Sequence, residues 1–65
     1  MTIQLNGESR EIAAGTSVRA LLAEMKLSPD KVAVELNRRL LRGERYDTVL
    51  QQDDALEIVT FVGGG

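Results

Sequence analysis

The residues best suited to chemistry are the last three of the chain, Gly63, Gly64 and Gly65. An extended triglycine spans up to about 10 Å, and without side chains it can enter a channel that is too narrow for other residues. An ionised carboxylate is a poor electrophile, so its use in group transfer requires activation, typically as an acyl-adenylate. We therefore predict a folded domain over residues 1–62 and a flexible tail over residues 63–65 that presents the Gly65 carboxylate to a partner. The alternative is a frayed terminus without a role, since chain ends are often disordered.

The rest of the sequence offers little intrinsic catalytic chemistry. It contains no histidine and no cysteine, which removes the commonest acid–base group, the commonest thiolate nucleophile and most zinc ligands. The serine and threonine hydroxyls therefore have no histidine to activate them. We expect the chain to hold no metal or cofactor of its own and not to be an enzyme by itself.

Two charged clusters each have a functional and an ordinary interpretation. Asp53-Asp54 could bind a divalent cation, but two adjacent carboxylates lack the spaced oxygen ligands of a calcium loop, so a solvated turn is favoured. Four arginines could dock an acidic partner, but they are interleaved with leucine and glutamate, and an exposed edge is favoured. These arginines are Arg38, Arg39, Arg42 and Arg45.

Length and composition indicate a single small domain. The chain has 65 residues, 43% of them hydrophobic and 28% charged, with a formal net charge of -2, which is a globular composition with one core. Basic and acidic residues are interspersed along the chain, so we do not expect a nucleic-acid partner. The sequence begins without the basic start and apolar run of a signal peptide, and no stretch approaches the roughly 20 apolar residues of a membrane span. We expect a cytoplasmic protein that does not bind membranes.

The first half of the chain predicts a β-hairpin followed by one helix. Asn6-Gly7 is a strong hairpin signal between strands over residues 2–5 and 8–12. After Gly15, the hydroxyls of Thr16 and Ser17 are suited to capping a helix. Apolar residues then recur at the spacing of one helical stripe, and the helix should stop before Ser28-Pro29. The stripe consists of Val18, Leu21, Leu22 and Met25.

The second half predicts shorter strands and one long final strand. Residues 32–36 and 39–41 form a second hairpin around Asn37-Arg38. Residues 43–50 lack a clear period, and we expect Tyr46, Val49 and Leu50 to face the core. After a polar turn at 51–54, residues 55–62 form a strand with Leu56 and Ile58 on one face and Val59 and Phe61 on the other. Apolar residues on both faces indicate a central strand, or one that meets a partner.

In its ordered motifs the sequence resembles the ThiS family of sulfur carrier proteins, which are small ubiquitin-like domains of thiamine biosynthesis. The resemblance covers essentially the full length, and the C-terminal ending is its most distinctive part. Its other segments are Ile3 to Glu8, Ala14 to Val18 with Leu21-Leu22, Val32 to Asn37, Asp53 to Val59, and Phe61-Val62 before the glycines.

The resemblance implies an α+β fold of the β-grasp type, a mixed sheet of four to five strands packed on one main helix. It also implies that a ThiF-type adenylyltransferase uses MgATP to adenylate Gly65, and that a persulfide donor then converts the carboxylate to a thiocarboxylate. A ThiG-type thiazole synthase accepts the sulfur. In this scheme the chain is a co-substrate of its partners.

A partner must hold the domain while it threads the glycines, so we also expect Val59, Phe61 and Val62 to form an apolar docking surface beside the tail. The alternative for Val59 and Phe61 is a place in the core. Three other functions stay open: the small subunit of molybdopterin synthase, a ubiquitin-like protein modifier, and an interaction module with an inert tail.

Overall fold

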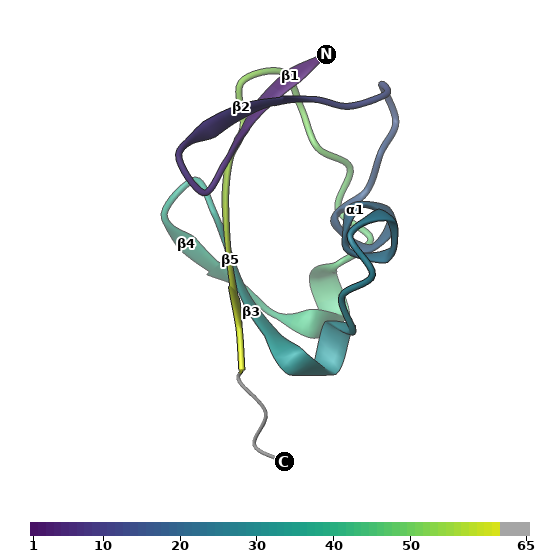
Figure 1. The fold of residues 1–65 in the computed structure, drawn as a ribbon, viewed down its shortest axis with the longest axis vertical. Coiled ribbons are helices and arrows are strands. Elements are labelled where there is room, and N and C mark those ends of the chain that lie inside the picture. Colours follow the sequence, from purple (N-terminus) through teal and green to yellow (C-terminus); the bar gives the residue numbers. More distant parts are fainter. Residues whose placement is uncertain (62–65) are drawn as a thin grey trace.

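The computed structural model describes residues 1–61, and these form a mixed five-stranded sheet with one α-helix packed against it (Figure 1). The strands are β1 (Thr2–Leu5), β2 (Glu8–Glu11), β3 (Val32–Leu36), β4 (Arg39–Leu41) and β5 (Ala55–Thr60). The helix is α1 (Val18–Glu24), and two short 3₁₀ helices are η1 (Pro29–Lys31) and η2 (Gly43–Arg45). The order across the sheet is β2-β1-β5-β3-β4. The predicted fold class is therefore confirmed.

Both predicted hairpins are present, and both turn on an asparagine. Asn6 and Gly7 have φ angles of 50° and 84°, and Asn37 and Arg38 have 52° and 71°. Two central residues with positive φ match the type I′ turn, whose twist suits the flanking strands. β1 pairs with β2 and β3 pairs with β4, both antiparallel.

The helix α1 begins as predicted and ends for a different reason. The Ser17 hydroxyl accepts a hydrogen bond from the Ala20 amide at 3.0 Å, which caps the first turn. The last helical residue is Glu24, and Met25 is the C-terminal cap. Lys26 has a φ of 60°, and the amides of Lys26 and Leu27 donate to the carbonyls of Ala23 and Leu22. This is a Schellman motif. The helix is therefore ended by this motif and not by Pro29, which lies four residues after the Met25 cap.

The core lies between α1 and one face of the sheet. Val18, Leu21 and Leu22 of the predicted stripe are fully buried, and Met25 is partly buried against them. From the sheet they meet Ile3, Val34 and Leu56, each with no exposed surface, together with Ile12, Val32 and Ile58. Within residues 1–61, no helix is both long and apolar enough to cross a membrane.

The segment between β4 and β5 also packs on the helix side of the sheet (Figure 1). Tyr46 and Leu50 are buried, as predicted, but Val49 is 45% exposed, so its predicted place in the core is wrong. The backbone is extended here, because Val49 forms an isolated β-bridge with Ser17 and Leu50 donates to the carbonyl of Thr16. Successive side chains of an extended chain point to opposite sides, so only Leu50 reaches the core.

Candidate functional site

The candidate site lies where β5 leads out of the sheet toward the glycines. Gly63, Gly64 and Gly65, and also Val62 of the predicted docking surface, lie outside the described residues. The predicted tail and its boundary at residue 62 therefore stay predictions. Phe61 is the last described residue, so the structure shows how the base of the site is held.

β5 is the central strand of the sheet, which makes it a firm base. It pairs in parallel with β1 at Gln4↔Ala55 and Leu5↔Leu56, and it is antiparallel to β3 from Leu36↔Leu56 to Val32↔Thr60. Leu56 and Ile58 point into the core. The pairing with β3 continues one residue past the strand, because the Phe61 amide donates to the Lys31 carbonyl at 2.9 Å.

Asn6 extends the support of β5 beyond the point where β1 stops. β1 ends at Leu5. The side-chain carboxamide of the next residue, Asn6, forms two hydrogen bonds with the backbone of Ile58. Its Oδ1 accepts from the Ile58 amide at 2.8 Å, and its Nδ2 donates to the Ile58 carbonyl at 3.3 Å. One side chain therefore replaces the backbone of a missing strand residue.

Asn37 supports the start of β5 with both its side chain and its backbone. Its Oδ1 accepts from the Ala55 amide at 2.9 Å, and its backbone amide donates to the Ala55 carbonyl at 2.7 Å. The sequence predicted both asparagines only as turn residues and missed this role. The available signal was the choice of asparagine, which tolerates positive φ and carries both a donor and an acceptor.

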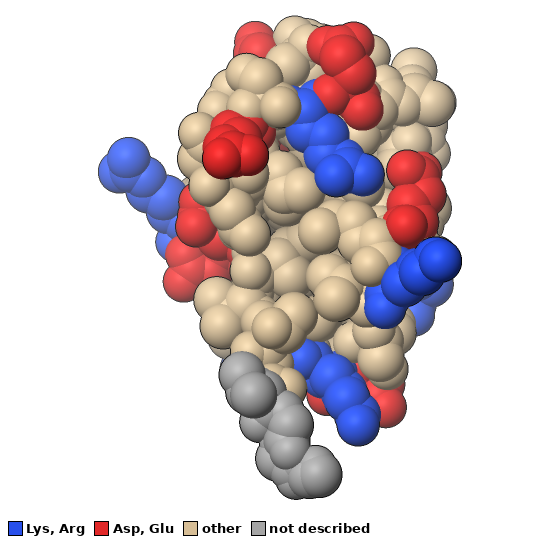
Figure 2. Space-filling view, viewed as in Figure 1, with Lys and Arg blue, Asp and Glu red and all other residues tan. Residues whose placement is uncertain are grey.

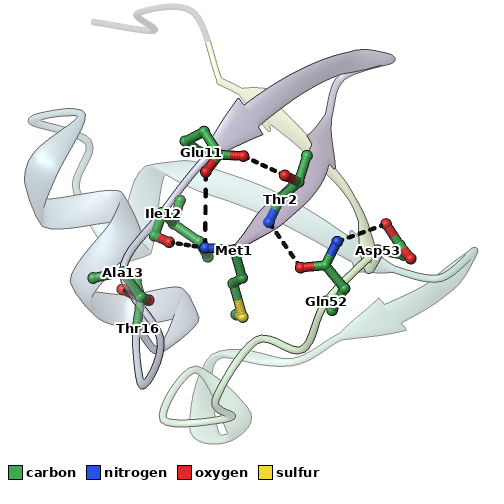
Figure 3. A network of polar contacts seen from close by, with 8 residues as sticks. All are labelled: Met1, Thr2, Glu11, Ile12, Ala13, Thr16, Gln52 and Asp53. Carbon is green, nitrogen blue, oxygen red and sulfur yellow. Dashed lines mark hydrogen bonds and ion pairs between the residues drawn. The ribbon is translucent and has the colours of Figure 1, made fainter.

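The turn before β5 is fixed by a polar network at the edge of β1 (Figure 3). The Thr2 amide donates to Gln52 Oε1 at 3.0 Å, and the Asp53 amide donates to the Thr2 carbonyl at 2.8 Å. The Met1 ammonium group donates to the Ile12 carbonyl at 2.8 Å, and the Thr2 hydroxyl donates to the Glu11 carboxylate. The contacts of Thr2 with Gln52 and Asp53 fix where β5 begins relative to β1, and the other two contacts join β1 to the end of the first hairpin.

The aspartates of this turn have structural partners. Asp54 accepts from the Gln51 amide at 2.8 Å and from Asn37 Nδ2 at 3.0 Å, and Asp53 accepts from Gln52 Nε2 at 3.1 Å. Within the described part of the chain, no group of three or more acidic side chains could hold a metal ion. The favoured interpretation of Asp53-Asp54 as a turn agrees with these contacts.

Val59 and Phe61 are exposed on the sheet face opposite α1. Val59 is 61% exposed and Phe61 is 59% exposed, so the alternative that placed them in the core is wrong. The prediction that they face away from Leu56 and Ile58 is confirmed. Acidic and basic side chains are interspersed over the view in Figure 2, which shows no continuous basic surface. The base of the site therefore presents two exposed apolar side chains, Val59 and Phe61.

Comparisons with known proteins identify the family. The model of the ThiS family matches residues 3–65. The chain belongs to the ThiS family. The sulfur carrier protein ThiS of Bacillus subtilis is 42% identical over 97% of this chain and 98% of its own length. A crystal structure of the thiamine biosynthesis protein ThiS from Geobacter metallireducens superimposes with a TM-score of 0.83 at 35% identity and covers 100% of both chains.

A second kind of relative is longer. The thiazole synthase of Magnetococcus marinus is 47% identical over 100% of this chain, and that of Paramagnetospirillum magneticum is 44% identical. The present chain spans only 20% of the length of each of these proteins. The resemblance to the ThiS family and its ubiquitin-like β-grasp fold is thus confirmed.

Proposed function

We propose that this ThiS-family chain is a sulfur carrier of thiamine biosynthesis that bears its sulfur on Gly65. The observation that carries the proposal is the position of β5, the central strand, which is followed by Phe61, the last described residue, and then by the Val62-Gly63-Gly64-Gly65 ending. Contacts from β1, β3, Asn6 and Asn37 hold this strand. A rigid base followed by residues without side chains is suited to delivering a carboxylate into another protein.

The chemistry begins with activation of the carboxylate. An oxygen of Gly65 attacks the α-phosphorus of MgATP on a ThiF-type adenylyltransferase, and pyrophosphate leaves. The terminal sulfur of a persulfide then attacks the acyl carbon, and AMP leaves. A second thiol cleaves the sulfur–sulfur bond, which leaves a thiocarboxylate on Gly65 and a disulfide on the donor side. Gly63 and Gly64 supply the reach and the narrow profile.

The acceptor is a ThiG-type thiazole synthase. Support comes from the two longer relatives named thiazole synthase, in which a region similar to this chain is part of the same polypeptide. Hydrolysis of the acyl–sulfur bond, with water supplying the oxygen, leaves the sulfur on the acceptor and restores a carboxylate on Gly65. MgATP is consumed by the partner, and this chain acts as a co-substrate.

The partner enzyme binds the domain through the exposed side chains that precede the tail. Val59 and Phe61 are apolar and exposed, and Val62 is the next apolar residue of the sequence. A partner that threads the glycines must hold the domain at a fixed distance, and exposed apolar side chains supply that contact.

Intact-mass spectrometry tests the proposal. The chain is incubated with ATP, a ThiF-type adenylyltransferase and a persulfide donor, and one oxygen should be replaced by one sulfur. Deletion of Gly65 should abolish the replacement without unfolding the domain, and sulfur loading of that variant would refute the mechanism.

The other outcomes separate the alternatives. Covalent adducts with lysines of other proteins would indicate a protein modifier, and no change with several activating enzymes would indicate an inert tail. Sulfur transfer to a molybdopterin synthase large subunit in place of a thiazole synthase would indicate the molybdopterin pathway.

A further inference from the structure

The turn of the first hairpin contains a dipeptide that is chemically reactive, Asn6-Gly7. In an unrestrained chain the backbone nitrogen of Gly7 attacks Cγ of Asn6, and ammonia leaves as a cyclic imide closes. Water then opens the ring to aspartate or to isoaspartate, in which the main chain runs through the former side-chain carbon. Glycine favours the attack, because it has no Cβ to hinder its nitrogen and its backbone rotates freely. The turn is therefore a candidate site of spontaneous deamidation.

The fold favours both residues of this dipeptide at their positions. Asn6 and Gly7 have φ angles of 50° and 84°, a region that asparagine and glycine tolerate better than other residues. The Asn6 side chain also accepts from the Ile58 amide and donates to the Ile58 carbonyl. An ionised aspartate has no donor for the second bond. The structural need of the turn thus creates the reactive sequence.

Burial does not protect this dipeptide from hydrolysis. Asn6 and Gly7 are both exposed, so water reaches them. What restrains Asn6 is its bonding, because both polar atoms of its carboxamide are held by Ile58, at 2.8 and 3.3 Å, and its own amide donates to the Leu56 carbonyl at 2.9 Å. Ring closure requires Cγ of Asn6 to leave Ile58 and to approach the Gly7 nitrogen. These hydrogen bonds must therefore open first.

We propose that Asn6 is a deamidation site whose reaction the folded domain suppresses, so that opening of the Asn6–Ile58 contact sets the chemical lifetime of the domain. The overall reaction consumes one water and releases one ammonia, and it needs no other reactant. Because the two hydrogen bonds to Ile58 must break before the ring closes, the folded chain reacts about tenfold more slowly than the unfolded chain. The inference is independent of the chemistry at Gly65.

The products of the reaction do not restore the contact. Aspartate keeps an acceptor for the Ile58 amide, but it sets a second oxygen in place of Nδ2 against the Ile58 carbonyl, so two acceptors face each other without a proton. In isoaspartate the main chain of the turn is longer by one atom. β5 then loses support at the point where β1 has ended. Opening thus promotes deamidation, and deamidation promotes further opening.

The second hairpin provides an internal control. Asn37 has a similar φ of 52°, and its Oδ1 also accepts from a backbone amide of β5, that of Ala55. The residue that follows it is Arg38, whose side chain hinders attack by the Arg38 nitrogen. Asn6 and Asn37 are the two asparagines of the sequence, so peptide mapping distinguishes their reactions.

The first test follows both asparagines by peptide mass spectrometry, in mildly alkaline buffer with and without guanidinium chloride above the unfolding midpoint. Asn6 should convert about tenfold more slowly in the folded chain than in the denatured chain, and faster than Asn37 in the denatured chain. A synthetic peptide of residues 3–9 in both solvents corrects for the effect of the denaturant on the reaction itself. Equal corrected rates at Asn6 in the two states overturn the protection.

Gly7→Arg is the matched variant, since it gives the first turn the Asn-Arg sequence of the second. In denaturant its Asn6 should convert as slowly as Asn37, whatever the stability of the variant. Wild-type conversion at Asn37 as fast as at Asn6 in denaturant overturns the choice of site.

Hydrogen exchange tests whether the Ile58 contact supplies the protection. The Ile58 amide donates to Asn6 Oδ1, so its exchange, measured by NMR, reports the opening of this contact. Protection of the Ile58 amide and retardation of deamidation should fall in parallel as small amounts of guanidinium chloride are added. An unprotected Ile58 amide in a chain whose Asn6 stays intact overturns the assignment to this contact.

The consequence for β5 is measured on the product. Deamidation adds a negative charge, so anion exchange separates the converted chains from the unmodified ones. The converted chains should have a lower urea midpoint than the unmodified chains. An unchanged midpoint overturns the predicted loss of support for β5.

Discussion

Asn6 and Ile58 are joined by a pair of hydrogen bonds across 52 residues of sequence, with Ile58 as donor at 2.8 Å and as acceptor at 3.3 Å. The Asn6 backbone reinforces them, since its amide donates to the Leu56 carbonyl at 2.9 Å. The turn of the first hairpin thus holds the strand that leads to the glycine tail. Loss of this side chain removes support from β5 at the point where β1 has ended.

We predict that Asn6→Ala lowers the free energy of unfolding by about 2 kcal/mol, because both backbone groups of the buried Ile58 lose their partner. Alanine at a φ of 50° adds conformational cost. Asn6→Asp keeps the acceptor for the Ile58 amide and should lose less. Urea denaturation measures both, and equal stability of Asn6→Ala and the wild type would contradict this role.

The helix cap gives a second prediction. Ser17→Ala removes the acceptor for the Ala20 amide and should lower the free energy of unfolding by about 1 kcal/mol. Ser9→Ala is the control, because Ser9 is exposed in the edge strand β2 and its hydroxyl accepts one long hydrogen bond, from Gln4 Nε2 at 3.2 Å. A thermal scan should show a lower Tm for Ser17→Ala alone.

Adjacent residues in the 42–54 segment should respond very differently to truncation. Leu50 is 1% exposed, so Leu50→Ala should cost about 2 to 5 kcal/mol, enough to unfold much of a domain of this size. Val49 is 45% exposed, and Val49→Ala should change stability by less than about 0.5 kcal/mol. Chemical denaturation measures the free energy of unfolding of both variants. Similar decreases for the two would show that Val49 also packs in the core.

Phe61→Ala separates docking from folding. Because Phe61 is exposed and its backbone keeps the bond to Lys31, the free energy of unfolding of the variant, measured in urea, should equal that of the wild type within about 0.5 kcal/mol. Its rate of ATP-dependent activation should fall, and a measurement of pyrophosphate release reports that rate. Val49→Ala is the matched control. A Phe61→Ala domain that no longer folds would remove the evidence for a docking role.

The order of the elements could be predicted from the sequence because its signals are local. Asn6-Gly7 and Asn37-Arg38 specify tight turns, Ser17 specifies a helix start, and alternation along 55–60 specifies a strand with two different faces. The family resemblance also depends on short segments in a fixed order. The chemistry expected of Gly65 follows from the sequence alone and stays a prediction.

Only the tertiary structure decided which surfaces are covered. Val59 and Phe61 could have been core residues until α1 and the 42–54 segment were seen to pack on the other face of the sheet. Val49 and Leu50 have the same apolar character, and the bridge to Ser17 selects which one is buried. The roles of Asn6 and Asn37 depend on contacts between residues that are distant in sequence. Local patterns carry no information on such pairings, because the partners meet only when the chain is folded.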